Sequence, residues 1–102
     1  MTRERLPDRR PHIVIPFEHG GVHYHAGFGR FADGRLAEIF LNSAKAGTAA
    51  DTAARDSAVV ASLALQHGVE IETIRHALTR NVDGTASGPL GHVLDLLAGD
   101  AR

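Results

Sequence analysis

The sequence predicts an α+β domain, in which an antiparallel sheet of about three strands is followed by three helices packed on one face of that sheet. Up to residue 41, apolar residues alternate with polar ones or form short β-branched runs between turn residues, which is typical of strands. After residue 48 the period changes to that of helices, and helix-capping signals appear. The length of 102 residues, 43% of them hydrophobic, fits one domain with one core.

The first predicted strand runs from His12 to Phe17. Its run of β-branched residues, Ile13-Val14-Ile15, favours a strand, and Pro16 makes it an edge strand or ends it. A Gly20-Gly21 turn follows.

The second strand is predicted from strict alternation, which places one apolar set on one face of the sheet. Val22, Tyr24, Ala26 and Phe28 alternate with His23, His25, Gly27 and Gly29. The turn from Ala32 to Arg35 contains Asp33-Gly34, which accepts the positive φ of a tight reversal. Leu36 to Leu41 then forms the returning strand.

The first helix is predicted to begin near Ala49, because Thr48 followed by Asp51 resembles a capping box, and to end at Gly68. Between Ala58 and Leu65 only Ser62 is polar, so this half of the helix must be covered on more than one side. We therefore expect the sheet to be joined there by another helix or by a second copy of the chain. The predicted oligomer interface consists of Val59, Val60 and Leu63.

Two shorter helices are predicted after Gly68. The first spans Val69 to Arg80 and offers apolar residues for packing, which are Ile71, Ile74, Ala77 and Leu78. Residues 81–88 are loop-like, and Pro89 suits the first turn of the last helix, which Gly99 ends. The apolar stripe of that helix is Leu90, Val93, Leu94 and Leu97.

The predicted domain organisation is a flexible N-terminal arm at residues 1–10, one domain at 11–99 and a tail at 100–102. The formal net charge of -1 gives no global positive field, so non-specific binding of nucleic acid is disfavoured. No cysteine occurs, which excludes disulfides and thiolate or thiyl chemistry. The N-terminus is charged and no long apolar run exists, so the chain is predicted to be cytoplasmic with no membrane contact.

Three histidines form the densest ionisable cluster. His23 and His25 share one face of the second strand and can reach one metal ion, with His19 across the turn as a third ligand. The alternative is that this face is simply the polar side of an amphipathic strand, which leaves an exposed patch sensitive to pH.

A second candidate is the turn before the first helix, from Lys45 to Thr48. Backbone N–H groups around Gly47, the helix dipole and the Lys45 ammonium together suit a phosphate or nucleotide. The alternative is that Gly47 makes a tight turn and Thr48 caps the helix, as nearly every helix requires.

A third candidate is a helix-turn-helix, whose spacing is matched by Ala64, Gly68, Val69 and Ile74. Glu70 and Glu72 would face the DNA groove, where phosphate contacts need the opposite charge. Arg75 and Arg80 compensate only in part. Nucleic acid is therefore an unlikely partner, and a helical hairpin explains the same spacing.

The stretch from Arg35 to Val69 resembles one family. It contains Arg-Leu-Ala-Glu-Ile-Phe-Leu-Asn, then Lys-Ala-Gly, then Ser-Leu-Ala-Leu-Gln-His-Gly-Val, and Arg5-Leu-Pro-Asp-Arg-Arg10 resembles the segment leading into it. The family is the C-terminal, so-called TSCPD, region of adenosylcobalamin-dependent ribonucleotide reductases. Its Thr-Ser-Cys-Pro-Asp signature is absent here. Because the likeness starts next to Met1, we expect a reductase-derived module encoded alone.

The resemblance implies a module from deoxyribonucleotide synthesis, but not the reaction itself, which needs cysteines in enzymes of this type. We therefore expect no catalytic residue and no cofactor on this chain, since adenosylcobalamin is implied only for the full-length enzyme. The preferred hypothesis is a protein-interaction or regulatory domain that forms a homo-oligomer and acts on a reductase or another cytosolic protein. Nucleotide or phosphate binding, and DNA binding, are the alternatives.

Overall fold

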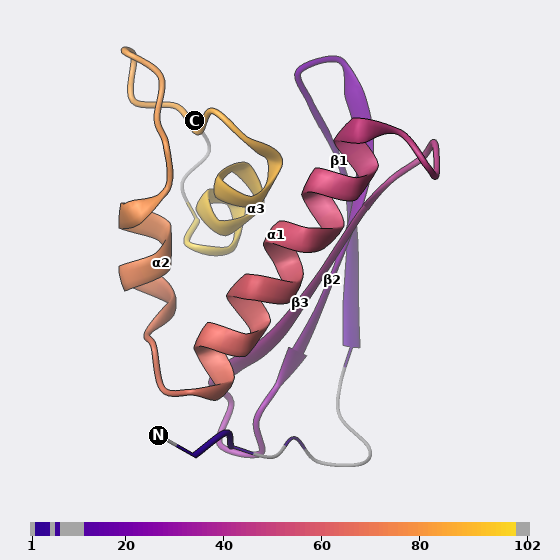
Figure 1. The fold of residues 1–102 in the computed structure, drawn as a ribbon. Coiled ribbons are helices and arrows are strands. Elements are labelled where there is room, and N and C mark those ends of the chain that lie inside the picture. The colour runs from indigo at the N-terminus through magenta and orange to yellow at the C-terminus, as the bar shows by residue number, and fades with distance from the viewer. Residues whose placement is uncertain (1, 5, 7–11, 100–102) are drawn as a thin grey trace.

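A computed structural model describes residues 2–4, 6 and 12–99, and it has the predicted α+β architecture (Figure 1). Its elements are β1 (His12–His19), β2 (Val22–Arg30), β3 (Leu36–Ser43), α1 (Ala49–Gln66), α2 (Ile71–Ala77) and α3 (Pro89–Leu97). The predicted tail at 100–102, and residues 1, 5 and 7–10 of the predicted arm, lie outside the described residues. Glu4, within that arm, accepts hydrogen bonds from Arg35.

The three strands form one antiparallel sheet in the order β1-β2-β3. In its register Ala26 of β2 lies between Ile15 of β1 and Leu41 of β3. The alternation predicted for β2 is confirmed, because Tyr24, Ala26 and Phe28 are all buried in the core. The prediction that Pro16 lies on an edge strand is also confirmed.

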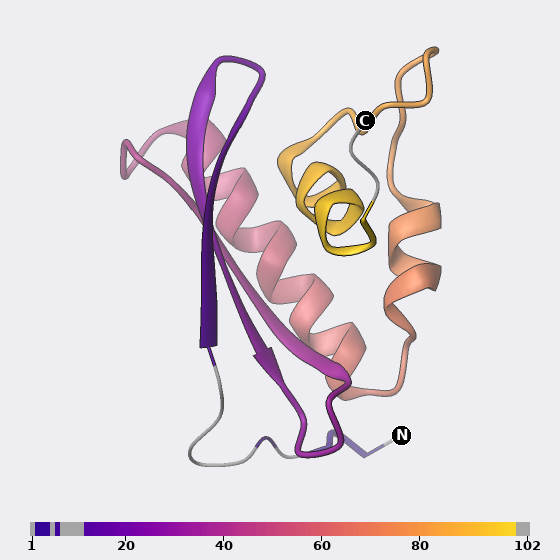
Figure 2. The same ribbon diagram turned by 180° about the vertical axis from the view of Figure 1, so that it is seen from behind.

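All three helices cover one face of this sheet, as predicted (Figures 1 and 2). α1 crosses the sheet along β3, and α3 lies between α1 and α2 in both views. α1 presents Ala54, Ala58 and Ala61 to the core, and these small residues allow it to approach the sheet closely. No helix in the described part of the chain is long and apolar enough to cross a membrane.

Side chains of α1 also close the outer edge of β3. The Ser62 hydroxyl accepts a hydrogen bond from Ile39 N–H at 2.8 Å and donates one to the Ile39 carbonyl at 3.0 Å. Gln66 Nε2 donates to the Ala37 carbonyl at 3.1 Å. Ser62 is therefore not an isolated polar residue in an apolar helix, because it satisfies main-chain groups that an edge strand would otherwise leave open.

The second helix is shorter than the range of residues 69–80 predicted for it. α2 stops at Ala77, Leu78 is already extended, and Ala77 itself is exposed rather than packed. The chain leaves the helix because Arg80 pairs with Ala86 in an isolated β-bridge, which makes residues 79–87 a small hairpin. Ile71, Ile74 and Leu78 pack against the core, as predicted.

Candidate functional site

The exposed side of α1 carries the three residues predicted as an oligomer interface. The exposed fractions are 56% for Val59, 66% for Val60 and 42% for Leu63. We call these three side chains the α1 stripe. The sheet and α3 cover the opposite side of the helix, where Ala58 and Leu65 are buried. The sequence predicted that this apolar segment is covered on more than one side, and the structure leaves the side with the α1 stripe open to solvent.

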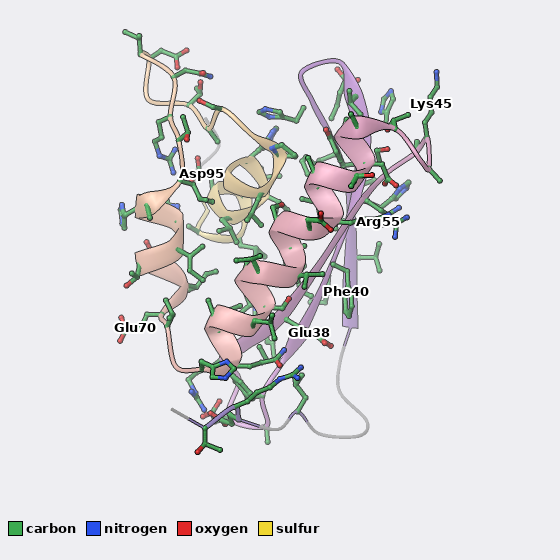
Figure 3. The ribbon with its side chains drawn as sticks, viewed as in Figure 1. Glu38, Phe40, Lys45, Arg55, Glu70 and Asp95 are labelled. Atoms are coloured by element: carbon green, nitrogen blue, oxygen red, sulfur yellow. The ribbon has the colours of Figure 1, made fainter. Side chains whose placement is uncertain are left out.

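The turn before α1 has the geometry expected of a helix cap. Gly47 has a φ of +82°, which favours glycine, and the Thr48 hydroxyl accepts a hydrogen bond from Asp51 N–H at 3.1 Å. The Thr48 hydroxyl also donates to the Lys45 carbonyl at 3.1 Å. The Lys45 side chain extends away from this turn (Figure 3).

The carboxylate of Asp51 occupies part of the place predicted for a phosphate. It accepts hydrogen bonds from Ser43 N–H at 2.8 Å, from Gly47 N–H at 3.3 Å and from Arg55 Nε at 2.9 Å. The bond from Ser43 N–H, and then the Arg55 guanidinium, hold the pKa of Asp51 below its usual range. The N–H of Gly47 is thus already paired with an anion of the chain itself, which favours the capping role.

A hollow of about 390 Å³ lies beside the same turn. His23, Lys45 and Thr48 line it, together with residues of the β1–β2 turn. The structure thus brings Lys45 close to one of the predicted metal ligands, a proximity that the sequence reasoning did not anticipate.

The three histidines of the predicted metal site do not come together. His23 and His25 are exposed on the face of the sheet that carries no helix, and His23 Nε2 lies 3.4 Å from a carboxylate oxygen of Glu18. His19 instead lies on the helix side, where its Nδ1 is 2.9 Å from Nδ1 of His92 on α3. Within the described residues, no group of three or more metal-ligating side chains of the His, Cys, Asp or Glu type occurs.

The pair of His19 and His92 is a feature that sequence reasoning missed. His19 Nε2 lies 3.0 Å from the Ser87 carbonyl, and the His92 ring packs edge-on against Phe17, with 5.1 Å between ring centroids. Burial, followed by the nearby His19, lowers the pKa of His92. Because 73 residues separate the two histidines in the sequence, no local sequence pattern predicts their contact.

The arginines considered for DNA binding are engaged inside the protein. Asp95 of α3 is 1% exposed and accepts hydrogen bonds from Arg75 Nε at 2.8 Å and from both terminal nitrogens of Arg80 at 2.7 Å. Glu72 remains on the surface of α2 and binds Arg75 at 3.2 Å. The charge that points outward from this helix is therefore still unfavourable for DNA phosphates.

Comparison with known proteins identifies the family. The model of the TSCPD domain family matches residues 4–99, and the chain therefore belongs to this family. The match confirms the resemblance seen in the stretch from Arg35 to Val69. No solved structure matches the chain.

Its relatives include vitamin B12-dependent ribonucleotide reductases from several bacteria. The chain is 38% identical over 77 residues to the enzyme of Agrobacterium fabrum, which covers 76% of this chain. It is 32% identical over 90 residues to the enzyme of Rhodopirellula baltica, an alignment that covers 88% of this chain. It is 34% identical over 72 residues to the enzyme of Streptomyces coelicolor, which covers 71% of this chain. The chain spans only 6 to 8% of the length of these three relatives.

Proposed function

We propose that this member of the TSCPD family is a non-catalytic accessory module of vitamin B12-dependent ribonucleotide reduction, which works through protein contacts and self-associates through the α1 stripe. The observation that carries the proposal is the exposure of Val59, Val60 and Leu63 on one side of a helix. Removing such side chains from water is the main favourable term in protein association.

A second copy of the chain is the occupant that best fits this stripe. In an antiparallel pairing of two α1 helices about a two-fold axis between Ala61 and Ser62, Val60 of one copy faces Leu63 of the other. The same axis places Asp56 of one copy opposite His67 of the other, so a carboxylate meets an imidazole beyond each end of the α1 stripe. Residues of α1 and its cap therefore supply both sides of this contact.

Sedimentation velocity at concentrations up to about 100 μM tests self-association, because dimer formation follows mass action. We expect the wild-type chain to dimerise and Leu63→Glu to be monomeric, since it places two like charges at the centre of the contact. Thr52→Glu is the matched control, because it adds the same charge at an exposed position of α1 outside the stripe. A wild-type monomer across this range would rule out the proposed contact.

The reductase context rests on the relatives. Their printed name is vitamin B12-dependent ribonucleotide reductase, and this chain matches a small part of each. Because the chain has no cysteine, we propose that it modulates or tethers such an enzyme rather than performing its chemistry. Adding the module to a purified enzyme of this class, and measuring turnover and co-sedimentation with wild type and Leu63→Glu, tests that role. A lack of effect on turnover, together with a lack of co-sedimentation, contradicts it.

A second candidate function is the binding of a phosphate or nucleotide at Lys45, Gly47 and Thr48. The hollow that Lys45 and Thr48 line beside His23 favours it, although Asp51 competes for the Gly47 N–H. Titration with dNTPs monitored by thermal unfolding distinguishes the two, because a bound nucleotide raises the midpoint and Lys45→Ala abolishes that rise. An unchanged midpoint in the wild type removes this candidate.

A further inference from the structure

A second hollow of about 390 Å³ lies where α1, β2 and the start of α3 meet. Its volume falls in the range of small-molecule sites. Ala50, Ala53 and Ala54 form the α1 wall, while Leu78 and Leu90 contribute from the other side. None of its lining residues carries a charge, so the site favours an apolar body with few polar contacts.

Tyr24 lines this hollow, and its hydroxyl has no hydrogen-bond partner among the described residues. Tyr24 is 5% exposed, and its ring stacks on Phe17 with 5.5 Å between centroids. No described residue forms a hydrogen bond with its hydroxyl, whereas every fully buried side-chain oxygen in the described part of the chain has a partner. The hydroxyl therefore keeps access to solvent, and Tyr24 is one of the residues that line this hollow.

The start of α3 supplies two more donors to the same hollow. Gly88 occupies the cap position and has no side chain with which to cap, and Pro89 follows it without an N–H. Neither Leu90 N–H nor Gly91 N–H donates to a described residue, although both residues are buried. In α1, by contrast, the Thr48 hydroxyl accepts a hydrogen bond from Asp51 N–H, the group that corresponds to Gly91 N–H.

From this convergence we infer that the hollow binds a small monocarboxylate with an apolar body, such as an arylacetate or a branched-chain acid. One carboxylate oxygen accepts from the N–H groups of Leu90 and Gly91, where the helix dipole also favours negative charge. The other accepts from the Tyr24 hydroxyl. A phosphate is disfavoured because a dianion needs a lysine or arginine, and the lining contains neither.

This inference goes beyond the proposed protein-contact role and stands independently of it. The lining residues do not include Val59, Val60 or Leu63, so a monomeric Leu63→Glu variant retains the hollow. Failure of self-association and failure of ligand binding are therefore separate results.

Amide NMR spectra of the full chain, titrated with phenylacetate to about 20 mM, test the inference at the level of single residues. We expect the largest chemical-shift changes at the amides of Leu90 and Gly91. Phenylacetamide, which lacks the charge, should bind with a dissociation constant at least tenfold higher. Static Leu90 and Gly91 signals overturn the inference, as does equally tight binding of the amide or of inorganic phosphate.

Two variants locate the site. Tyr24→Phe keeps the stack on Phe17 and is expected to weaken phenylacetate binding about tenfold, the effect of one hydrogen bond to a charged group. Ala53→Leu fills the hollow from an exposed position of α1 and is expected to abolish binding, whereas Thr52→Leu, next to it but outside the lining, leaves it unchanged. Binding that survives Ala53→Leu refutes this location.

Discussion

Replacing Asp95 by asparagine tests how α2 and the 79–87 hairpin are held to α3. The Asp95 carboxylate accepts three hydrogen bonds of 2.7 to 2.8 Å from Arg75 and Arg80, whose side chains are 15% and 27% exposed. The Arg80 guanidinium, and then Arg75, hold the pKa of Asp95 far below its usual range. Asparagine keeps the shape of the side chain but removes the charge that both guanidinium groups require.

Breaking a buried ion pair costs about 3 to 5 kcal/mol. Because Arg80 is partly exposed and can recover some hydration, we take the low end, about 3 kcal/mol, for Asp95→Asn. A domain of this size has a free energy of unfolding of roughly 5 to 15 kcal/mol, so the loss is a large fraction of its stability. At about 4 to 8 °C per kcal/mol, the unfolding midpoint should fall by about 12 to 24 °C.

Thermal and urea unfolding followed by circular dichroism measure this loss. Asp56→Asn is the matched control when both substitutions are made in the Leu63→Glu background, where the proposed contact between copies is absent. It removes an exposed carboxylate of α1 and is expected to change stability by less than about 0.5 kcal/mol. The carboxyl of Asp95 has a depressed pKa, so its contribution is complete above about pH 4 and is lost as the pH falls through the lower, folded-state pKa. The difference between wild type and Asp95→Asn should therefore narrow in acid. A fall of less than about 4 °C at neutral pH would refute the reasoning.

Three further perturbations follow from other contacts. Ser62→Ala leaves the Ile39 N–H without its partner and should cost about 1 to 3 kcal/mol in urea unfolding, with faster amide exchange at Ile39; normal exchange there contradicts the edge role. Gly29→Ala places a methyl group 2.7 Å from Glu38 Cγ and should lower the free energy of unfolding by about 1 to 3 kcal/mol. In a double-mutant cycle, Glu38→Ala should relieve this penalty, and a penalty that stays the same would contradict the clash. Burial depresses the pKa of His92, so the unfolded chain takes up a proton more readily, and the free energy of unfolding should fall as the pH drops below about 6.5. His92→Phe should make the free energy of unfolding less dependent on pH in this range. An unchanged pH dependence in this variant would mean that another group causes it.

Features encoded by neighbouring residues were predictable from the sequence. The Thr48 and Asp51 cap follows from their spacing, and the structure has the expected bond between them. The alternation around Tyr24 and Phe28 fixed the buried face of β2. In each of these cases the determining residues lie within a few positions of one another, so local geometry decides the outcome.

The features missed by the sequence reasoning depend on contacts between distant segments. Ser62 reads as one polar residue in an apolar helix, and only its position beside Ile39 reveals that it closes a strand edge. The end of α2 depends on Arg80, which pairs with Asp95 fifteen residues further on. The opening of the hollow at Tyr24 likewise requires β2 and the start of α3 to meet, which no local pattern specifies.

The contacts that close the edge of β3 also explain why the α1 stripe remains exposed. Ser62 and Gln66 bind the main chain of β3, and Asp51 binds Ser43 N–H at the other end of the helix. Val60 lies about 200° around the helix from Ser62, so these bonds direct it away from the sheet. Rotating α1 to bury Val60 would break them at about 1 kcal/mol each and reopen a strand edge to pairing with other chains. Because the helix cannot turn its own stripe inward, any cover for the stripe has to come from another surface, which is the reason for proposing a second copy of the chain.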